Sequence, residues 1–405
     1  MSWGKEILSK MAQSKKRIYL DHAATTPLDR EVLEAMNPYF SDKFGNASSL
    51  HSFGREARKD MEEARKKISN IINARPNEII FTSGGTESNN LAIKGIAYAN
   101  KSKGNHIITT KIEHHAIEEP CKWMEKELGF KITYLGVNKD GLIDLRELEN
   151  AINEKTILVS VMFANNEIGT IQPIEEIGKI CKKQKHKIYF HTDAVQGLGK
   201  EKIDVKKMNI DLLSASGHKM YGPKGTGILY INQDAKIQGI QHGGGHEFHL
   251  RSGTENVPGI IGFAKALELM DENREKENKR LQELRDYTIK RILKEIPGSH
   301  LNGSMEKRLA NNINFYFDDI EGESLLIRLD EKGFAVSTGS ACSSKSLEPS
   351  PVLTAIGLKP EQAHGSLRVT LGKDNTKEEI ELFIEELKKI IQSLRKISPF
   401  KHSKF

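Results

Sequence analysis

Strands and helices alternate along the first half of this chain, and this alternation constrains the fold more than any other feature. Short apolar runs are each followed by a segment whose apolar residues recur every three or four positions. The expected strands are 78–82, 106–110, 131–137, 157–162 and 187–191, and the expected helices include 54–71, 115–128 and 173–183. Such alternation predicts an α/β fold in which helices sandwich a mainly parallel sheet.

The alternation stops near residue 250, which predicts a second domain. A long charged helix is expected over 259–295, a strand over 312–317 and a closing amphipathic helix over 376–397. We expect a large domain over 29–265 and a smaller α+β domain made of 17–28 and 266–405. Residues 1–16 are expected to form a flexible extension.

Composition excludes several classes of protein. The 61 Lys and Arg exceed the 55 Asp and Glu by only six in 405 residues, which is weak evidence for nucleic-acid binding. No apolar run is long enough to cross a bilayer, and the N-terminus lacks the apolar core of a signal peptide. Cys121, Cys181 and Cys342 are too widely spaced for a disulfide framework or a zinc site. We therefore expect a cytoplasmic protein with no intrinsic metal.

A lysine stands on a short turn in the stretch from Ser214 to Gly225. Apolar runs at 211–213 and 227–231 predict a buried strand on each side of Lys219. Burial lowers the pKa of a lysine and makes its amine nucleophilic, so Lys219 is a candidate for a Schiff base with pyridoxal phosphate. Taken alone, Lys219 is more simply interpreted as a surface loop residue.

Polar clusters follow the neighbouring strands, and they favour the functional interpretation of Lys219. Gly85 and Thr86 stand at a helix start that can hold a phosphate. Asp193 ends a buried strand, where a carboxylate can keep a cofactor ring nitrogen protonated. Each cluster also has an ordinary interpretation as a turn or helix cap. Their shared position at the carboxyl ends of the strands indicates a ligand site.

These motifs together resemble those of the pyridoxal-phosphate-dependent cysteine desulfurases of the NifS/IscS type, class V aminotransferases of fold type I. The resemblance runs from Ile18 to Ile397. Its motifs are 19–27, 82–90, 165–169, 216–219, 251–254 and 340–342.

The resemblance implies a role for each matching residue. Lys219 forms the Schiff base, Asp193 pairs with the ring nitrogen and His114 stacks on the ring and takes part in catalysis. Arg368 and Asn166 bind the substrate, and a guanidinium suits a carboxylate better than an ammonium. The remaining cofactor contacts that it implies are Gly85, Thr86, Asn166, Gln196, Ser216, His218 and, across a dimer interface, Thr254.

Cys342 separates this branch from the aminotransferases. Its neighbours are small and polar, so the segment 337–348 is expected to be an exposed, mobile loop. The family resemblance implies that Cys342 attacks the substrate sulfur, carries it as a persulfide, and contacts a cluster at most transiently. Cys121 and Cys181 lie on predicted amphipathic helices and are expected to be structural.

The implied function is conversion of L-cysteine to L-alanine, with sulfur passed to iron–sulfur cluster assembly and possible use in tRNA thiolation. The implied partners are a second copy of the chain and an IscU/NifU-like scaffold or another sulfur acceptor. The short basic segment 398–405 differs from the longer tail of IscS proteins, so its effect on scaffold docking is open. Three alternatives also remain open: a selenocysteine lyase, an aminotransferase and a catalytically silent scaffold.

Overall fold

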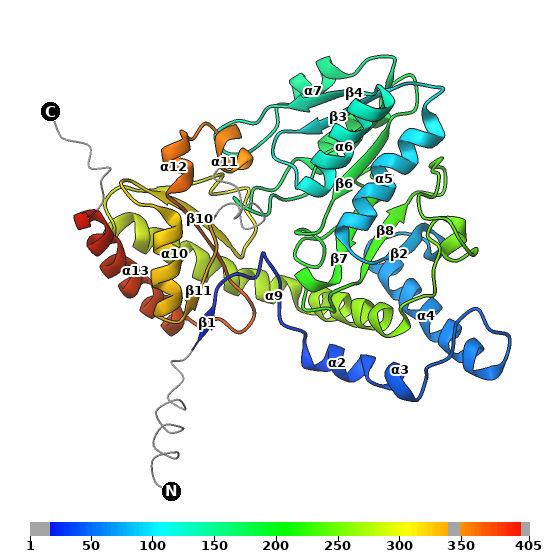
Figure 1. Cartoon of the computed structure of the whole chain (residues 1–405), viewed down its shortest axis with the longest axis horizontal. Helices are drawn as coiled ribbons and strands as arrows, with labels where there is room; N and C mark the ends of the chain where they lie inside the picture. The colour runs from blue at the N-terminus through cyan, green and yellow to red at the C-terminus, as the bar shows by residue number, and fades with distance from the viewer. Residues whose placement is uncertain (1–16, 339–348, 398–405) are drawn as a thin grey trace, which may run out of the picture.

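A seven-stranded sheet forms the centre of the larger part of the molecule. The computed structural model describes residues 17–338 and 349–397, and Figure 1 shows the sheet with helices on both sides. Its strands are β2 (Ile79–Thr82), β3 (His106–Thr110), β4 (Lys131–Leu135), β5 (Thr156–Ser160), β6 (Tyr189–Asp193), β7 (Leu212–Ser216) and β8 (Gly227–Ile231). Their spatial order is β2-β8-β7-β6-β5-β3-β4, and β8 runs antiparallel to both of its neighbours. The other neighbouring pairs are parallel.

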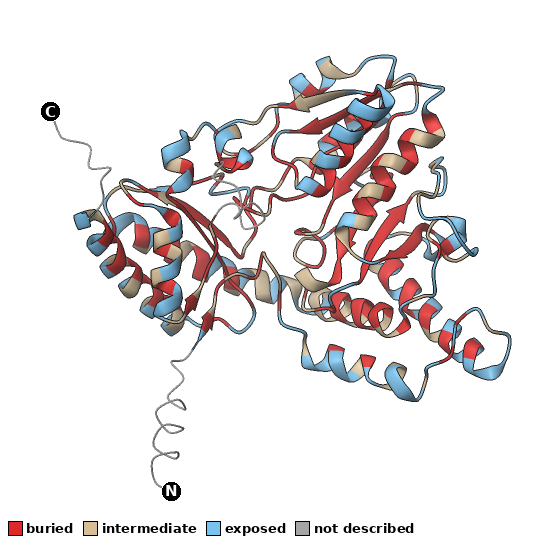
Figure 2. Ribbon diagram, viewed as in Figure 1, coloured by how far each residue is buried: buried red, intermediate tan, exposed pale blue. Residues whose placement is uncertain are grey.

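Successive residues of a strand face opposite layers of helices, which explains the continuous apolar runs. Leu212 packs with α5 (Gly85–Asn100) and α6 (His115–Leu128), whereas Leu213 packs with α4 (Ser52–Ile71), α8 (Ile174–Lys182) and the first part of α9 (Val257–Glu295). Figure 2 shows that the strands are buried and that the outer faces of these helices are exposed. A strand covered on both faces needs apolar side chains at every position. The shorter elements of this part are α2 (Arg30–Met36), α3 (Pro38–Ser41), η1 (Pro76–Glu78) and α7 (Leu145–Ala151).

The smaller part has its own sheets and core. Strands β9 (Ser299–Leu301), β10 (Asn312–Phe317) and β12 (Ser366–Thr370) form an antiparallel sheet, and β1 (Ile18–Tyr19) pairs with β11 (Phe334–Ala335). This core packs against α10 (Gly322–Glu331), α13 (Lys377–Ile397) and the last part of α9. Two short helices, α11 (Pro351–Ala355) and α12 (Pro360–His364), lie toward the larger part (Figure 1).

The predicted fold class is confirmed, and one expected helix is wrong. The sequence predicts one helix from the Asp29 cap through Phe40. Asp29 does cap α2, because its side chain accepts a hydrogen bond from the Glu31 N–H. The helix then ends before Pro38, which starts α3, since proline lacks the N–H that would continue the helix.

Helix α9 belongs to both cores. Val257 to Leu267 lie in the core of the larger part, and Leu281 to Ile292 lie in that of the smaller part. We propose a domain boundary inside this helix, at residue 266. The described part of the chain holds no helix that is long and apolar enough to cross a membrane.

Candidate active site

A cavity of about 410 Å³ lies at the carboxyl ends of the central strands, where the larger part meets β12 of the smaller part. Ten of the residues predicted for the site line it: Gly85, Thr86, His114, Asn166, Asp193, Gln196, Ser216, His218, Lys219 and Arg368. Thr254 is exposed and does not line this cavity. Cys342 lies outside the described residues.

Lys219 lies at the end of η2 (Gly217–Lys219), the short turn between β7 and β8. Its Nζ donates hydrogen bonds to the carbonyl oxygens of Ala23 at 2.5 Å and Ala24 at 2.8 Å. The sequence places these carbonyls almost 200 residues earlier, so their contact with Lys219 was not predictable from spacing. The first segment of the chain therefore holds the amine at the cavity.

One end of the cavity can hold a phosphate. The first N–H groups of an α-helix have no partner within the helix, and α5 starts here at Gly85. Gly84 has a φ of +154°, and a Cβ on Gly227 would come within 2.6 Å of the Gly84 Cα. The loop at Gly84 therefore packs directly on β8, and the start of α5 lies beside Ser216 at the end of β7.

Asp193 lies at the end of β6, on the same sheet edge. Its Oδ1 accepts the Val195 N–H at 2.9 Å, and its Oδ2 accepts the side-chain amide of Asn89 at 2.7 Å. These two bonds fix the plane of the carboxylate. Asn89 is a site residue that the sequence analysis did not single out, although it lies within the quoted motif 82–90.

His114 caps α6 with its Nδ1, which accepts the Ala116 N–H at 3.0 Å. Burial lowers the pKa of His114, although the charge of Asp193 opposes this effect. The neutral ring therefore carries its proton on Nε2. This tautomer offers a flat ring face and an N–H donor, and the cap bond occupies the nitrogen that could act as a base.

His218 is neutral for similar reasons. Burial, then the charges of Lys219, Lys224 and Lys200, lower its pKa to about 4. Its Nδ1 lies 3.2 Å from the Thr25 Oγ1, and Thr26 bonds the carbonyl of His218. The segment that holds Lys219 thus also fixes its neighbour.

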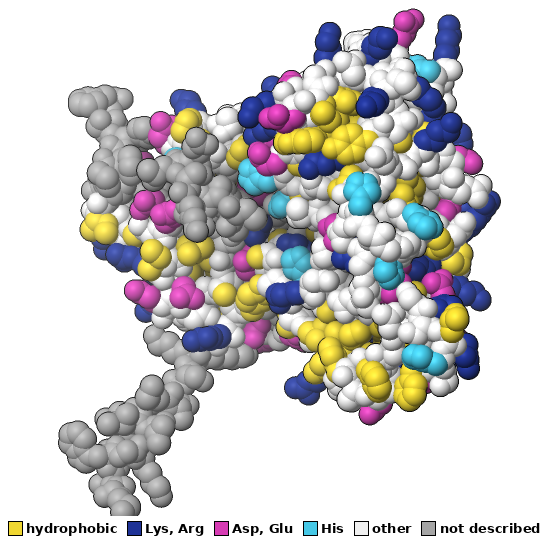
Figure 3. Space-filling model, turned by 45° about the vertical axis from the view of Figure 1, so that its right-hand side comes forward, with side chains coloured by type: hydrophobic (Ala, Val, Ile, Leu, Met, Phe, Trp, Pro, Cys, Tyr) yellow, Lys and Arg dark blue, Asp and Glu magenta, His cyan; other side chains and the backbone are white. Residues whose placement is uncertain are grey.

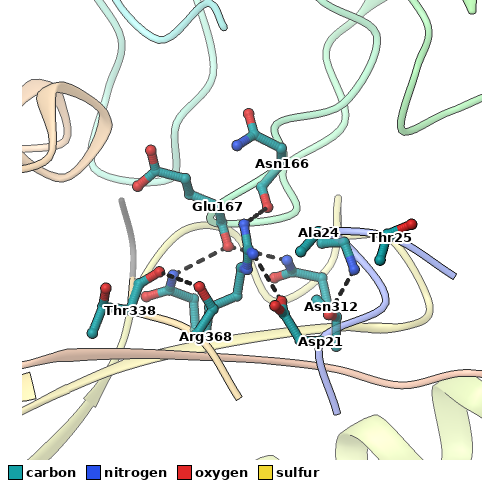
Figure 4. A network of polar contacts seen from close by, with 12 residues as sticks. Asp21, Ala24, Thr25, Asn166, Glu167, Asn312, Thr338 and Arg368 are labelled. Atoms are coloured by element: carbon teal, nitrogen blue, oxygen red, sulfur yellow. Dashed lines mark hydrogen bonds and ion pairs between the residues drawn. The ribbon is translucent and has the colours of Figure 1, made fainter. Parts of the chain in front are cut away.

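Arg368 lies on β12 and brings a charge from the smaller part into the cavity. Its Nη1 donates to the Asn166 carbonyl at 3.0 Å and its Nη2 to the Asp21 carboxylate at 2.9 Å. Figure 4 shows the guanidinium between these two partners. Its Nε is buried and has no hydrogen-bond partner in the described part of the chain. Arg368 lines the cavity, and a guanidinium there is suited to a carboxylate.

Two buried glutamates beside the cavity escaped the sequence analysis. Burial raises the pKa of Glu113 to about 8 and that of Glu167 to about 7. The Oε1 of Glu113 accepts the Met162 N–H and the Thr110 hydroxyl, both at 2.9 Å, whereas its Oε2 has no partner in the described structure. Glu113 precedes His114 directly, but nothing in its spacing signals burial.

Both described ends of the segment that contains Cys342 contact residues of the cavity. Ser337 pairs with Arg368 through two backbone hydrogen bonds. Ser350 donates its hydroxyl to the Glu167 carboxylate at 2.6 Å. The chain therefore leaves the described structure beside Arg368 and re-enters it beside Glu167.

The donor set fits pyridoxal phosphate. A helix start with Ser216 and His218 suits the phosphate, an oriented carboxylate suits the ring nitrogen, and the Lys219 amine lines the same cavity. A Cβ on Gly85 would meet the Val195 side chain at 2.7 Å, so the cradle is closely packed around glycine.

Comparisons with known proteins agree with this geometry. The family model for class-V aminotransferases matches residues 18–383. A protein of Dictyoglomus turgidum named cysteine desulfurase IscS is 57% identical over 387 residues, which cover 96% of this chain and 98% of that protein. A protein of the same name from Methanosarcina thermophila is 55% identical over 389 residues, which cover 96% and 95%.

Solved structures lead to the same family. A structure described as a NifS-like protein superposes with a TM-score of 0.88 at 40% identity, covering 93% of this chain and all of that one. A NifS-like protein from Rickettsia africae gives 0.83 at 35% identity, covering 93% and 99%. The chain therefore belongs to the class-V aminotransferase family, within its branch of NifS- and IscS-type proteins.

Proposed function

We propose that this protein is a pyridoxal-phosphate-dependent cysteine desulfurase that converts L-cysteine to L-alanine and passes the sulfur to Cys342. The observation that carries the proposal is the convergence of Lys219, Asp193 and Arg368 on one cavity that both described ends of the Cys342 segment contact. Membership of the family implies pyridoxal phosphate as the cofactor, and the residues that line the cavity fit it.

The cofactor residues act at two ends of the cavity. The start of α5, Ser216 and His218 would hold the phosphate, and Asp193 would hold the ring nitrogen. The ring of His114 would cover the cofactor. When bound, pyridoxal phosphate holds the substrate amine and stabilises negative charge at the substrate Cα. Lys219 would hold the cofactor through its amine, and it is the base that we assign to the substrate Cα proton, which it returns to Cα before alanine leaves.

Arg368 orients the substrate. Its guanidinium lines the cavity and can receive a carboxylate, while Asp21 and the Asn166 carbonyl keep it in place. Fixing the carboxylate and the amine leaves the substrate side chain as the part that faces the sulfur acceptor.

Sulfur transfer follows as a displacement. The Cys342 thiolate attacks the substrate sulfur, so that an S–S bond forms and the Cβ–S bond breaks. The electron pair of the broken bond stays on Cβ, which takes up a proton and leaves as the methyl group of alanine. The proton that the Cys342 thiol loses on forming the thiolate balances the one that Cβ takes up. His114, whose neutral ring lines the cavity, is the residue that we assign to assist this transfer.

Partners and location belong to the same proposal. We assign the sulfur to iron–sulfur cluster assembly, with an IscU/NifU-like protein as acceptor. A homodimer is supported by Thr254, which is exposed, and by apolar side chains exposed on α3, on the start of α4 and on the loop that joins them, namely Phe40, Phe44, Leu50 and Phe53. Figure 3 shows hydrophobic side chains gathered on the lower part of the molecule. A reducing cytoplasm is supported by Cys121 and Cys181, which are buried free thiols.

The test is product formation from L-cysteine with no 2-oxo acid present. Wild-type protein is expected to release alanine and, with a reductant, an equal amount of sulfide. Lys219→Ala is expected to release neither. A requirement for a 2-oxo acid would replace the proposal with an aminotransferase, and faster turnover of selenocysteine than of cysteine would replace it with a selenocysteine lyase.

A further inference from the structure

Lys200 lies beside the active site and takes no part in the proposed chemistry. Lys200 follows β6 by seven residues and lines a second cavity of about 300 Å³, which Lys219 also lines. Its Nζ donates a hydrogen bond to the Gln196 Oε1 at 2.9 Å. Gln196 lines the first cavity, so this bond connects a residue of the second cavity with the cofactor site.

The two partners of Gln196 determine the orientation of its amide. The Nε2 donates to the Ala23 carbonyl oxygen at 3.0 Å, and this oxygen can only accept. The opposite atom of the amide must then be the oxygen, which meets the Lys200 amine. Burial, and then the charge of Lys219, lower the pKa of Lys200 to about 7. The Lys200 amine has an N–H to donate whether it is charged or neutral, so the Gln196 amide keeps the same orientation as Lys200 titrates.

Lys200 is itself fixed from α9. The Asn278 side chain on α9 donates to the Lys200 carbonyl oxygen at 2.6 Å. Gly199 has a φ of +81°, and a Cβ there would lie 3.2 Å from the Met270 side chain. The backbone at Gly199 and Lys200 therefore packs against α9, and this packing fixes the position from which the Lys200 side chain extends.

We propose that Lys200 is a positioning residue, which holds the Gln196 amide so that its second N–H meets the oxygen on the cofactor ring. This inference rests on the proposed function, in which Gln196 contacts the ring. An amide has two N–H donors, and the Ala23 carbonyl takes one of them. Without Lys200 the Ala23 carbonyl is the one described partner that still holds the amide, so the amide is less firmly held toward the ring. Lys200 then acts on the cofactor through Gln196.

The test measures cofactor binding, which needs no turnover. Lys200→Met is expected to weaken pyridoxal phosphate binding about tenfold, the size of one lost hydrogen bond to a charged group, and to shift the visible absorption of the bound cofactor. Lys200→Arg keeps a donor and is expected to restore both. Lys276→Met removes an exposed lysine of the same second cavity and is expected to change neither.

A double variant separates positioning from a general structural effect. If Lys200 acts through Gln196, adding Lys200→Met to Gln196→Ala is expected to weaken binding no further. Independent, multiplying losses would overturn the proposal, as would unchanged affinity and spectrum in Lys200→Met. Should Lys200→Met fail to fold, Gln196→Glu tests the amide donor on which the proposal depends. The carboxylate keeps the acceptor for Lys200 but has no N–H for Ala23 or the ring, so unchanged binding there would overturn the proposal. Failure of the proposed function would appear separately, as wild-type protein that binds the cofactor and forms no alanine.

Discussion

At the scale of single residues, Arg368 is the group that we propose to bind the substrate carboxylate. We predict that Arg368→Lys raises the KM for L-cysteine about 10- to 100-fold, because one ammonium cannot replace two side-by-side N–H donors. Steady-state alanine formation measures this effect. Arg328→Lys on α10, where the guanidinium contacts Ser393, is the matched control. An unchanged KM in Arg368→Lys would remove Arg368 from the substrate site.

Glu113 predicts a pH dependence of stability. Burial raises the pKa of its carboxyl from 4.5 to about 8. Between pH 4.5 and pH 8 the folded state keeps the Glu113 proton, which the unfolded state loses. The contribution of this group to the free energy of unfolding is therefore full below pH 4.5 and declines as the pH rises toward 8. Glu113→Gln imitates the protonated form. Its stability relative to wild type is therefore expected to rise with pH across this window, by up to ~1.4 kcal/mol per unit.

Thermal unfolding of both proteins between pH 5 and pH 8 checks this. Glu125→Gln, which changes an exposed glutamate of α6, is the control and is expected to give a flat difference. A Glu113→Gln difference that stays flat or falls with pH would show that the carboxyl is ionised in the folded protein.

At the scale of elements, the close packing of β8 against the loop before α5 sets the phosphate end of the cavity. We predict that Gly227→Ala pushes this loop away and weakens pyridoxal phosphate binding at least tenfold, because a Cβ would meet the Gly84 Cα at 2.6 Å and the Ala215 carbonyl oxygen at 2.7 Å. Gly136→Ala, where the nearest atom is a Glu147 oxygen at 3.8 Å, is expected to bind normally. Fluorescence or absorbance titration of the cofactor distinguishes the two, and equal binding would contradict the assignment.

Much of the larger part was predictable because its strands and helices are encoded locally. The expected strands 106–110, 227–231 and 312–317 and the expected helix 115–128 match the structure at both ends. Strand β12 and helix α10 were missed. The apolar pattern of β12 is short and is interrupted by the charged Arg368. The apolar residues of α10 lie among acidic ones, which obscures their helical spacing.

The long-range contacts that complete the site are not predicted by any local sequence pattern. Lys219 meets Ala23 from 196 residues away, and Arg368 meets Asp21 from 347 residues away. The sequence shows that residues 19–27 form a motif, but which atoms they meet depends on how the two parts pack. Glu113 and Lys200 were missed for the same reason, since burial of a charged side chain is a property of the folded molecule.

At the scale of the whole molecule, the proposed dimer with shared sites predicts complementation. Thr254→Ala and Lys219→Ala subunits are each expected to be impaired, because one lacks the contact across the interface and the other lacks the amine. A mixed dimer contains one site with both changes and one site with neither. We expect the mixture to regain alanine formation beyond the sum of its parts, and additive activity would contradict shared sites.

The central claim is that Cys342 receives the sulfur of L-cysteine. The most direct measurement is mass spectrometry of the peptide containing Cys342 after wild-type protein has turned over L-cysteine without reductant, with alanine quantified in the same sample. The account predicts one added sulfur on this peptide and the formation of alanine, with Cys121 and Cys181 unmodified because both are buried. Alanine formed while Cys342 stays unmodified would contradict it.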